Sequence, residues 1–244
     1  MEADREAQET PAVGLRRDGA AALGSTERPK AVIFDLWDTL ALWPSEAFEE
    51  VKQALAHHIA DFERVWDTTY DRRQSGPIDA YFRGLGLEDA AVDACVRLRS
   101  DFTRRALVPR EGAIETLEEL GGRGLKRGLI SVCSSDVEEA WDALELARHL
   151  DEVVLSCAVG LRKPDPAIYL LTCERLAVEP DECLFVGDGA NDELAGAERV
   201  GMKAVCVLPP GRNEPLWPEA RGWEPTIRAL PEVLELLEPA EQLD

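Results

Sequence analysis

The feature of this sequence that most restricts its fold is a regular alternation of short apolar runs and helical segments after residue 110. Buried parallel strands appear in a sequence as continuous apolar runs, and helices appear as apolar residues spaced three or four apart. Strands are expected at Ala31–Phe34, Gly128–Cys133, Val153–Cys157, Cys183–Val186 and Ala204–Leu208. Helices are expected at Glu111–Gly122, Val137–Ala147, Pro166–Leu176 and around Leu194–Val200. Because such units connect through right-handed crossovers, the sequence predicts an α/β, Rossmann-like parallel sheet.

The stretch between the first two strands breaks this alternation. Residues 45–107 show helical periodicity, as in Phe48, Val51 and Leu55, and contain no convincing strand. We therefore expect an inserted helical cap at 45–107, with the α/β core formed by 30–44 and 108–244. Residues 1–29 are rich in Glu, Ala, Gly and Arg without periodicity, which is typical of a disordered tail.

Four polar residues follow predicted strands at or near their C-terminal ends: Asp35, Ser131, Lys163 and Asp188. In an open α/β sheet the carboxyl ends of parallel strands meet at one edge, and ligands bind there. The sequence therefore predicts that these four side chains form one site.

The residues that flank these four positions form recognisable sequence motifs. The segments FDLWDTL (34–40), the strand containing Ser131, RKPDP (162–166) and VGDGAND (186–192) occur in this order. Together they resemble the four motifs of the haloacid dehalogenase-like hydrolase superfamily, over residues 30–208. Asp35 and Ser131 are 96 residues apart, whereas Ser131 and Lys163 are 32 apart. This spacing resembles the subgroup with a helical cap inserted after the first motif, called C1.

The resemblance implies covalent catalysis at Asp35. A carboxylate nucleophile would attack phosphorus and form an aspartyl-phosphate, which splits one difficult step into two. Lys163 would act as a point charge on the phosphoryl and carboxylate oxygens, and Ser131 would donate a hydrogen bond to the substrate.

The same resemblance implies a magnesium site. Mg²⁺ prefers oxygen ligands and keeps several waters. The expected ligands are Asp35, the backbone carbonyl of Trp37, and Asp188, while Asp192 would help to position the water shell of the metal or Lys163.

The first motif departs from the phosphatase pattern. Most phosphatases of this superfamily read DxDxT, and their second Asp is the general acid–base; here Trp37 stands at that position. A tryptophan cannot protonate a leaving oxygen. Haloacid dehalogenases of the family carry an aromatic residue there and need no metal, but Asp188 and Asp192 favour a cation. Asp38, one residue later, is the candidate replacement acid.

The leading hypothesis is a magnesium-dependent, cytoplasmic phosphatase that acts on a small phosphorylated metabolite, slowly or on a leaving group that needs little protonation. One alternative is a metal-independent 2-haloacid dehalogenase. Another is a catalytically degenerate domain that serves in binding or regulation, which Trp37 would favour. A phosphonate hydrolase would need a cap lysine, and Lys52 is the only lysine in the cap segment. Substrate identity and oligomeric state stay open.

Composition excludes other partners. The chain has 244 residues, 27 of them basic and 48 acidic, for a formal net charge of −21. Nucleic acids and anionic membrane surfaces select basic surfaces, so neither is an expected partner. The six cysteines form no CxxC pair and are interpreted as reduced thiols of a cytoplasmic protein. A small phosphate remains compatible if a metal and Lys163 supply the local positive field.

Overall fold

The computed structural model describes residues 28–238, so residues 1–27 of the predicted tail lie outside the described residues. Its centre is a six-stranded sheet in the order β3-β2-β1-β4-β5-β6, and every neighbouring pair is parallel. The strands are β1 (Ala31–Phe34), β2 (Lys126–Ser131), β3 (Glu152–Leu155), β4 (Cys183–Gly187), β5 (Lys203–Val207) and β6 (Thr226–Ile227). The predicted α/β, Rossmann-like class is confirmed.

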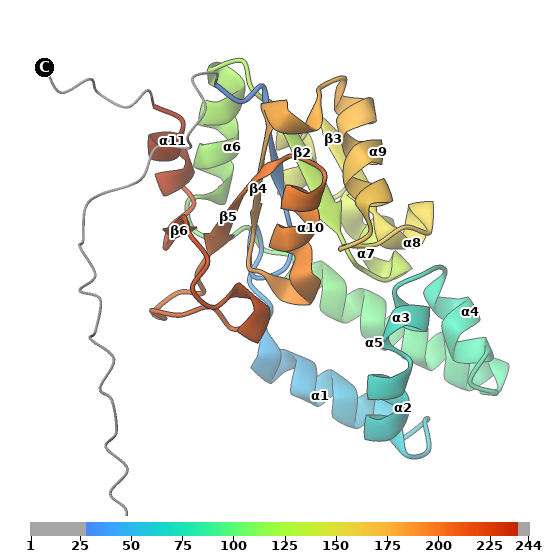
Figure 1. Ribbon diagram of the computed structural model, residues 1–244. Coiled ribbons are helices and arrows are strands. Elements are labelled where there is room, and N and C mark those ends of the chain that lie inside the picture. Colours follow the sequence, from blue (N-terminus) through green and yellow to red (C-terminus); the bar gives the residue numbers. More distant parts are fainter. Residues whose placement is uncertain (1–27, 239–244) are drawn as a thin grey trace, which may run out of the picture.

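Helices cover both faces of the sheet (Figure 1). On one face lie α6 (Ala113–Gly122), α7 (Ser135–Trp141) and α11 (Glu232–Leu236), and on the other lie α9 (Pro166–Leu176) and α10 (Glu193–Arg199). Because successive strand residues point to opposite faces, Val32 and Phe34 join the first apolar core while Ala31 and Ile33 join the second. Burial on both faces explains why these strands read as continuous apolar runs.

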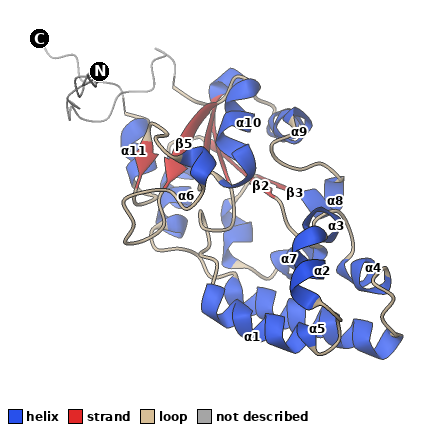
Figure 2. Ribbon diagram, turned by 60° about the horizontal axis from the view of Figure 1, so that its bottom comes forward, coloured by secondary structure: helices blue, strands red, loops and turns tan. Residues whose placement is uncertain are grey.

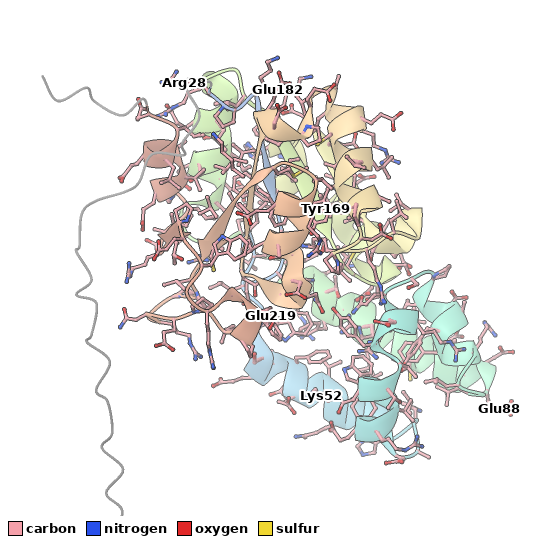
Figure 3. All side chains as sticks on the ribbon, in the orientation of Figure 1. Arg28, Lys52, Glu88, Tyr169, Glu182 and Glu219 are labelled. Atoms are coloured by element: carbon pink, nitrogen blue, oxygen red, sulfur yellow. The ribbon has the colours of Figure 1, made fainter. Side chains whose placement is uncertain are left out.

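Between residues 45 and 106 the chain forms helices and their connecting turns, without a strand. The helices are α1 (Ser45–Ala56), α2 (Phe62–Thr68), α3 (Tyr70–Arg73), α4 (Ile78–Arg83) and α5 (Asp89–Ala106). Figure 2 shows them together beyond the end of the sheet, and they share an apolar core of their own. Helix α5 packs against α7, so this helical segment, referred to below as the cap, covers one edge of the α/β core. Figure 3 places Lys52 and Glu88 on the cap and Arg28 and Glu182 at the opposite end of the molecule.

Several boundaries differ from the predicted ones. The helix expected at Val137–Ala147 ends at Trp141 and is followed by a 3-10 turn, Glu145–His149. The strand expected to reach Cys157 ends at Leu155, because α8 (Ser156–Val159) begins there. Shorter 3-10 turns occupy Pro180–Glu182, Ala190–Asp192 and Pro218–Ala220. Among residues 28–238, no helix is long and apolar enough to cross a bilayer.

Candidate active site

Asp35 and Lys163 meet at the C-terminal edge of the sheet. Asp35 directly follows β1, and its backbone N–H donates to the Val186 carbonyl at 2.9 Å, which continues the pairing with β4. Both side chains are buried, and the Lys163 ammonium donates to Asp35 Oδ1 and, at 2.5 Å, to Glu193 Oε2. Helix α9 begins three residues after this lysine, with the Asp165 side chain capping it. The lysine is therefore held between a strand end and a helix start.

Three buried carboxylates surround this ammonium. One oxygen from each of Asp35, Asp188 and Glu193 lies within 4.8 Å of the others. Burial and the nearby charge of Asp35 raise the pKa of Asp188 to about 6, and burial raises the pKa of Glu193 well above its usual range. Burial opposes the charge of Lys163, but the Asp35 and Glu193 carboxylates outweigh it and raise the pKa of this lysine. When all three carboxyls are ionised, the cluster holds three negative charges against the one positive charge of Lys163.

Glu193, and not its neighbour Asp192, lies in this cluster with Asp35 and Asp188. The Asp192 side chain is exposed, and Asn191 and Asp192 both adopt the left-handed backbone conformation, with φ of 55°. This turn directs Glu193 inward, where Oε1 accepts the Gly189 N–H at 3.0 Å. A Cβ at Gly187 would lie 2.2 Å from the same oxygen, so the glycine leaves room for the glutamate. The motif offers two adjacent acids, and spacing alone did not tell which one points inward.

A cavity of about 450 Å³ opens in front of Asp35. Asp35, Asp38, Lys163, Asp188 and Glu193 line it together with the rings of Trp37, Trp43, Tyr70 and Trp217. The rings of Trp37 and Trp43 pack edge to face, with centroids 4.8 Å apart. The aromatic wall gives the reacting carboxylates a partly apolar surrounding.

Asp38 also faces this cavity. It adopts the left-handed conformation, with φ of 57°, and its Oδ1 accepts the Trp43 N–H at 3.0 Å. Burial raises the pKa of Asp38, and the neighbouring charge of Asp35 acts in the same direction. The carboxyl therefore keeps a proton to higher pH than an ordinary aspartate, as a general acid requires. Its assignment as the acid stays a prediction.

Trp217 is a site residue that the sequence did not reveal. It lies in the loop between β5 and β6 and is 40% exposed. Its indole Nε1 donates to Asp188 Oδ2 at 2.6 Å, while Oδ1 of the same carboxylate accepts the Ala190 N–H at 3.1 Å. Two donors therefore fix the orientation of Asp188. The loop has no periodic pattern and follows the last motif, so no sequence signal marked it.

Ser131 is buried at the end of β2, and the residues of this segment that line the cavity are its successors Val132, Cys133 and Ser134. The cap closes the other side of the cavity with Tyr70, Gln74 and Arg99.

Polar contacts hold the cap on the core. Arg99 Nη2 pairs with Asp136 of α7 at 3.0 Å, and Arg162 Nη2 donates to Asp71 of α3 at 2.9 Å. The Gln74 carbonyl accepts the Ser156 hydroxyl at 2.9 Å. The cavity is thus bounded by both parts of the molecule.

Comparison with known proteins agrees with this geometry. The signature of the haloacid dehalogenase-like hydrolase family matches residues 29–201. A glyceraldehyde 3-phosphate phosphatase of Methanopyrus kandleri is 31% identical over 73% of this chain and 83% of its own length. An (S)-2-haloacid dehalogenase 4A of Burkholderia cepacia is 32% identical over 68% of each chain. The crystal structure of a HAD phosphatase from Thermococcus onnurineus superimposes with a TM-score of 0.65, at 25% identity, over 85% of this chain and 97% of that one. The chain is therefore an enzyme of the haloacid dehalogenase-like hydrolase family.

Proposed function

We propose that this enzyme is a magnesium-dependent phosphatase that acts on a small phosphorylated metabolite through an aspartyl-phosphate at Asp35. The observation that carries the proposal is the buried cluster of Asp35, Asp188 and Glu193 around one ammonium. A reaction without a metal has no use for so many adjacent carboxylates, because each raises the energy of the others. The similarity to glyceraldehyde 3-phosphate phosphatases supports the same choice.

The residues present fit a magnesium ion. All three acidic groups offer the hard oxygen ligands that Mg²⁺ selects, and their uncompensated charge favours a divalent cation. Asp35, Asp188 and Glu193 would hold the ion, and the Trp37 carbonyl stays a predicted ligand. When bound, the ion would supply positive charge to the phosphoryl oxygens.

The side chains of the site then have separate roles. An Asp35 oxygen bonds to phosphorus as the bond from phosphorus to the leaving oxygen breaks, and Asp38 gives that oxygen its proton. Water next attacks phosphorus and gives a proton to the Asp38 carboxylate, and the Asp35 carboxylate leaves as inorganic phosphate forms. Lys163 holds Asp35 in position and offsets charge in both steps. Trp37 and Trp43 exclude bulk water from the reacting atoms.

Trp37 favours a second candidate, a metal-independent 2-haloacid dehalogenase. An aromatic ring beside the nucleophile suits a halide, which leaves without a proton, and an (S)-2-haloacid dehalogenase is among the relatives. Asp35 would then attack carbon and form an ester, which water hydrolyses. Asp188 and Glu193 have no role in that reaction.

A panel of phosphate esters and 2-haloacids, assayed with Mg²⁺ and with EDTA, separates the two candidates. The proposal predicts phosphate release that EDTA stops and no halide release. Halide release that persists in EDTA would establish the dehalogenase instead. If neither product forms, the phosphatase proposal fails.

A matched pair of variants tests which acid belongs to the metal site. Glu193→Gln removes one of the three clustered carboxylates, so we expect Mg²⁺ affinity to fall about 10- to 100-fold. Asp192→Asn makes the same chemical change at the adjacent exposed residue and should leave affinity within about twofold. Titration calorimetry measures both. A larger loss of Mg²⁺ affinity in Asp192→Asn than in Glu193→Gln would show that Asp192 belongs to the metal site instead.

Trp217→Phe removes the indole donor to Asp188 while keeping an aromatic ring. Because partners of metal ligands orient them, we expect Mg²⁺ to bind about tenfold more weakly. Trp223→Phe is the control, since its Nε1 donates to the Ala204 carbonyl instead of a carboxylate. Equal affinities of both variants, measured by calorimetry, would show that Trp217 does not orient the ligand.

Binding of Mg²⁺ should depend on pH through Asp188. Its pKa of about 6 lies above the ordinary 3.8, because burial disfavours the charged form. Below pH 6 a proton competes with the metal, so we expect affinity to fall about tenfold per pH unit and to level off above it. In the metal-free protein this group lowers stability as pH rises from about 4 to 6, because the folded state then holds more protons. Affinity that stays constant from pH 5 to 7 would contradict this account.

A further inference from the structure

A second cavity, of about 360 Å³, adjoins the first inside the cap. The two share Trp43, Tyr70, Gln74 and Arg99 in their linings, so they meet at a common wall. Tyr70 is one of these shared residues, and its pKa responds to the charges of both Lys163 and Arg73, after burial and a hydrogen bond from Asn191. The cavity beside Arg73 therefore lies next to the one that opens in front of Asp35.

Arg73 is the unusual group of this second cavity. Its guanidinium is buried, stacks on the Trp66 ring at 3.6 Å, and donates from Nη1 to the Trp66 carbonyl at 2.8 Å. Within residues 28–238, no carboxylate lies within ion-pairing distance of it. Burial lowers the pKa of Arg73, although Tyr81 hydrogen-bonds the group and acts the other way. A buried charge without a counter-ion is costly, so a bound anion would stabilise this group.

The surroundings leave this charge uncompensated. Arg99, the other guanidinium of the cavity, already has Asp136 as its partner at 3.0 Å. Asp67 lines the rim, but its side chain is exposed to water and forms no ion pair with Arg73. In the described part of the chain, Gln74 Oε1 and Arg99 Nε are buried and lack hydrogen-bond partners. The cavity thus holds one unpaired cation and further unused polar atoms.

We propose that the second cavity binds a carboxylate of the substrate through Arg73, so that the enzyme selects phosphate esters whose other end carries a carboxylate. The proposal rests on the phosphatase function, with the phosphate at Asp35 and Lys163. A guanidinium offers a planar fork that matches a carboxylate. One unpaired guanidinium matches one negative charge, and Asp67 at the rim disfavours the higher charge of a second phosphate.

The test uses short phosphate esters that carry a terminal carboxylate, each paired with its neutral primary amide and with the corresponding bisphosphate. We expect kcat/KM for the acid to exceed that for the amide by about 30-fold or more, as for a buried charge pair. Arg73→Gln should lower kcat/KM for the acid far more than kcat/KM for the amide and so remove this preference, and a thermal melt of the same sample shows whether the variant folds. Arg73→Lys should restore part of it. Arg72→Gln, at the exposed neighbouring arginine, is the matched control and should keep the full preference.

Equal kcat/KM for acid and amide in the unaltered enzyme would overturn the proposal, as would an equal loss for both in Arg73→Gln. A bisphosphate preferred over the carboxylate would overturn the assigned substrate class. If no ester is hydrolysed, the phosphatase function fails, and the subsite is judged by binding alone. For that case the phosphate ester acid is titrated into Asp35→Asn protein while tryptophan fluorescence is followed, because Trp66 stacks on Arg73. Quenching that Arg73→Gln abolishes supports the carboxylate subsite, and quenching that persists contradicts it.

Discussion

Asp35→Asn should lower phosphate release by more than about 10³-fold, because an amide cannot form the covalent bond to phosphorus. The change preserves shape, and Lys163 keeps its contact with Glu193, so the fold should persist. A steady-state assay at saturating Mg²⁺, beside a thermal melt of the same sample, measures both quantities.

Asp192→Asn is the control for this experiment, since it makes the same change at an exposed residue of the neighbouring loop. It should retain nearly full activity. If Asp35→Asn kept more than about a tenth of the activity while Asp192→Asn was unaffected, Asp35 would not be the nucleophile. The catalytic scheme would then need a different acceptor for the phosphoryl group.

Lys163→Met should destabilise the metal-free protein by about 3–5 kcal/mol, because it leaves buried carboxylates without their cation. The Lys163 side chain is 3% exposed and contacts both Asp35 and Glu193. Its pKa is raised in the folded state, so the stabilisation is fully present below the ordinary value of 10.5 and is lost only as the pH rises beyond it. The loss should therefore be visible throughout the neutral range in urea unfolding curves.

Lys52→Met makes the same substitution at an exposed ion pair with Glu49, whose contribution is at most about 1 kcal/mol. Added Mg²⁺ should restore part of the stability of Lys163→Met, since a cation again offsets the carboxylates. Equal unfolding midpoints for the two variants would mean that the acidic cluster does not depend on Lys163.

The sheet was predictable because buried parallel strands leave a simple trace in the sequence. The run Ala31–Phe34 was placed at its observed ends, and the other major strands were placed within two residues. Strand β6 was not predicted, because two residues, Thr226 and Ile227, show no periodicity. The helix after β2 was predicted to be too long, because the apolar spacing continues into the 3-10 turn at Glu145–His149.

The candidate site was predictable where a motif fixes one residue at a strand end, as for Asp35, Lys163 and Asp188, which all line the cavity. The site was not predictable where the local backbone conformation determines which side chain points inward. The left-handed turn at Asn191 and Asp192 directs Glu193 inward, and sequence spacing does not reveal such a turn.

Sequence patterns also did not predict the residues that tertiary contacts bring to the two cavities. Trp217 reaches Asp188 from a loop after β5, and Arg73 reaches its cavity from a short cap helix. The sequence does not distinguish Arg73 from its neighbour Arg72 or from the arginine pair at 104 and 105. Arg73 became a candidate for anion binding only because it is buried without a carboxylate partner, and this burial results from the packing of the cap.

The most direct measurement of the central claim is an acid-quenched single turnover, with enzyme in excess over a hydrolysed phosphate ester, followed by peptide mass analysis. The peptide that contains Asp35 should gain the mass of one phosphoryl group. EDTA should prevent this gain, and the Asp35→Asn protein should lack it. Phosphate release with the label on another residue would contradict the account, and so would modification of Asp35 by the carbon skeleton of a haloacid.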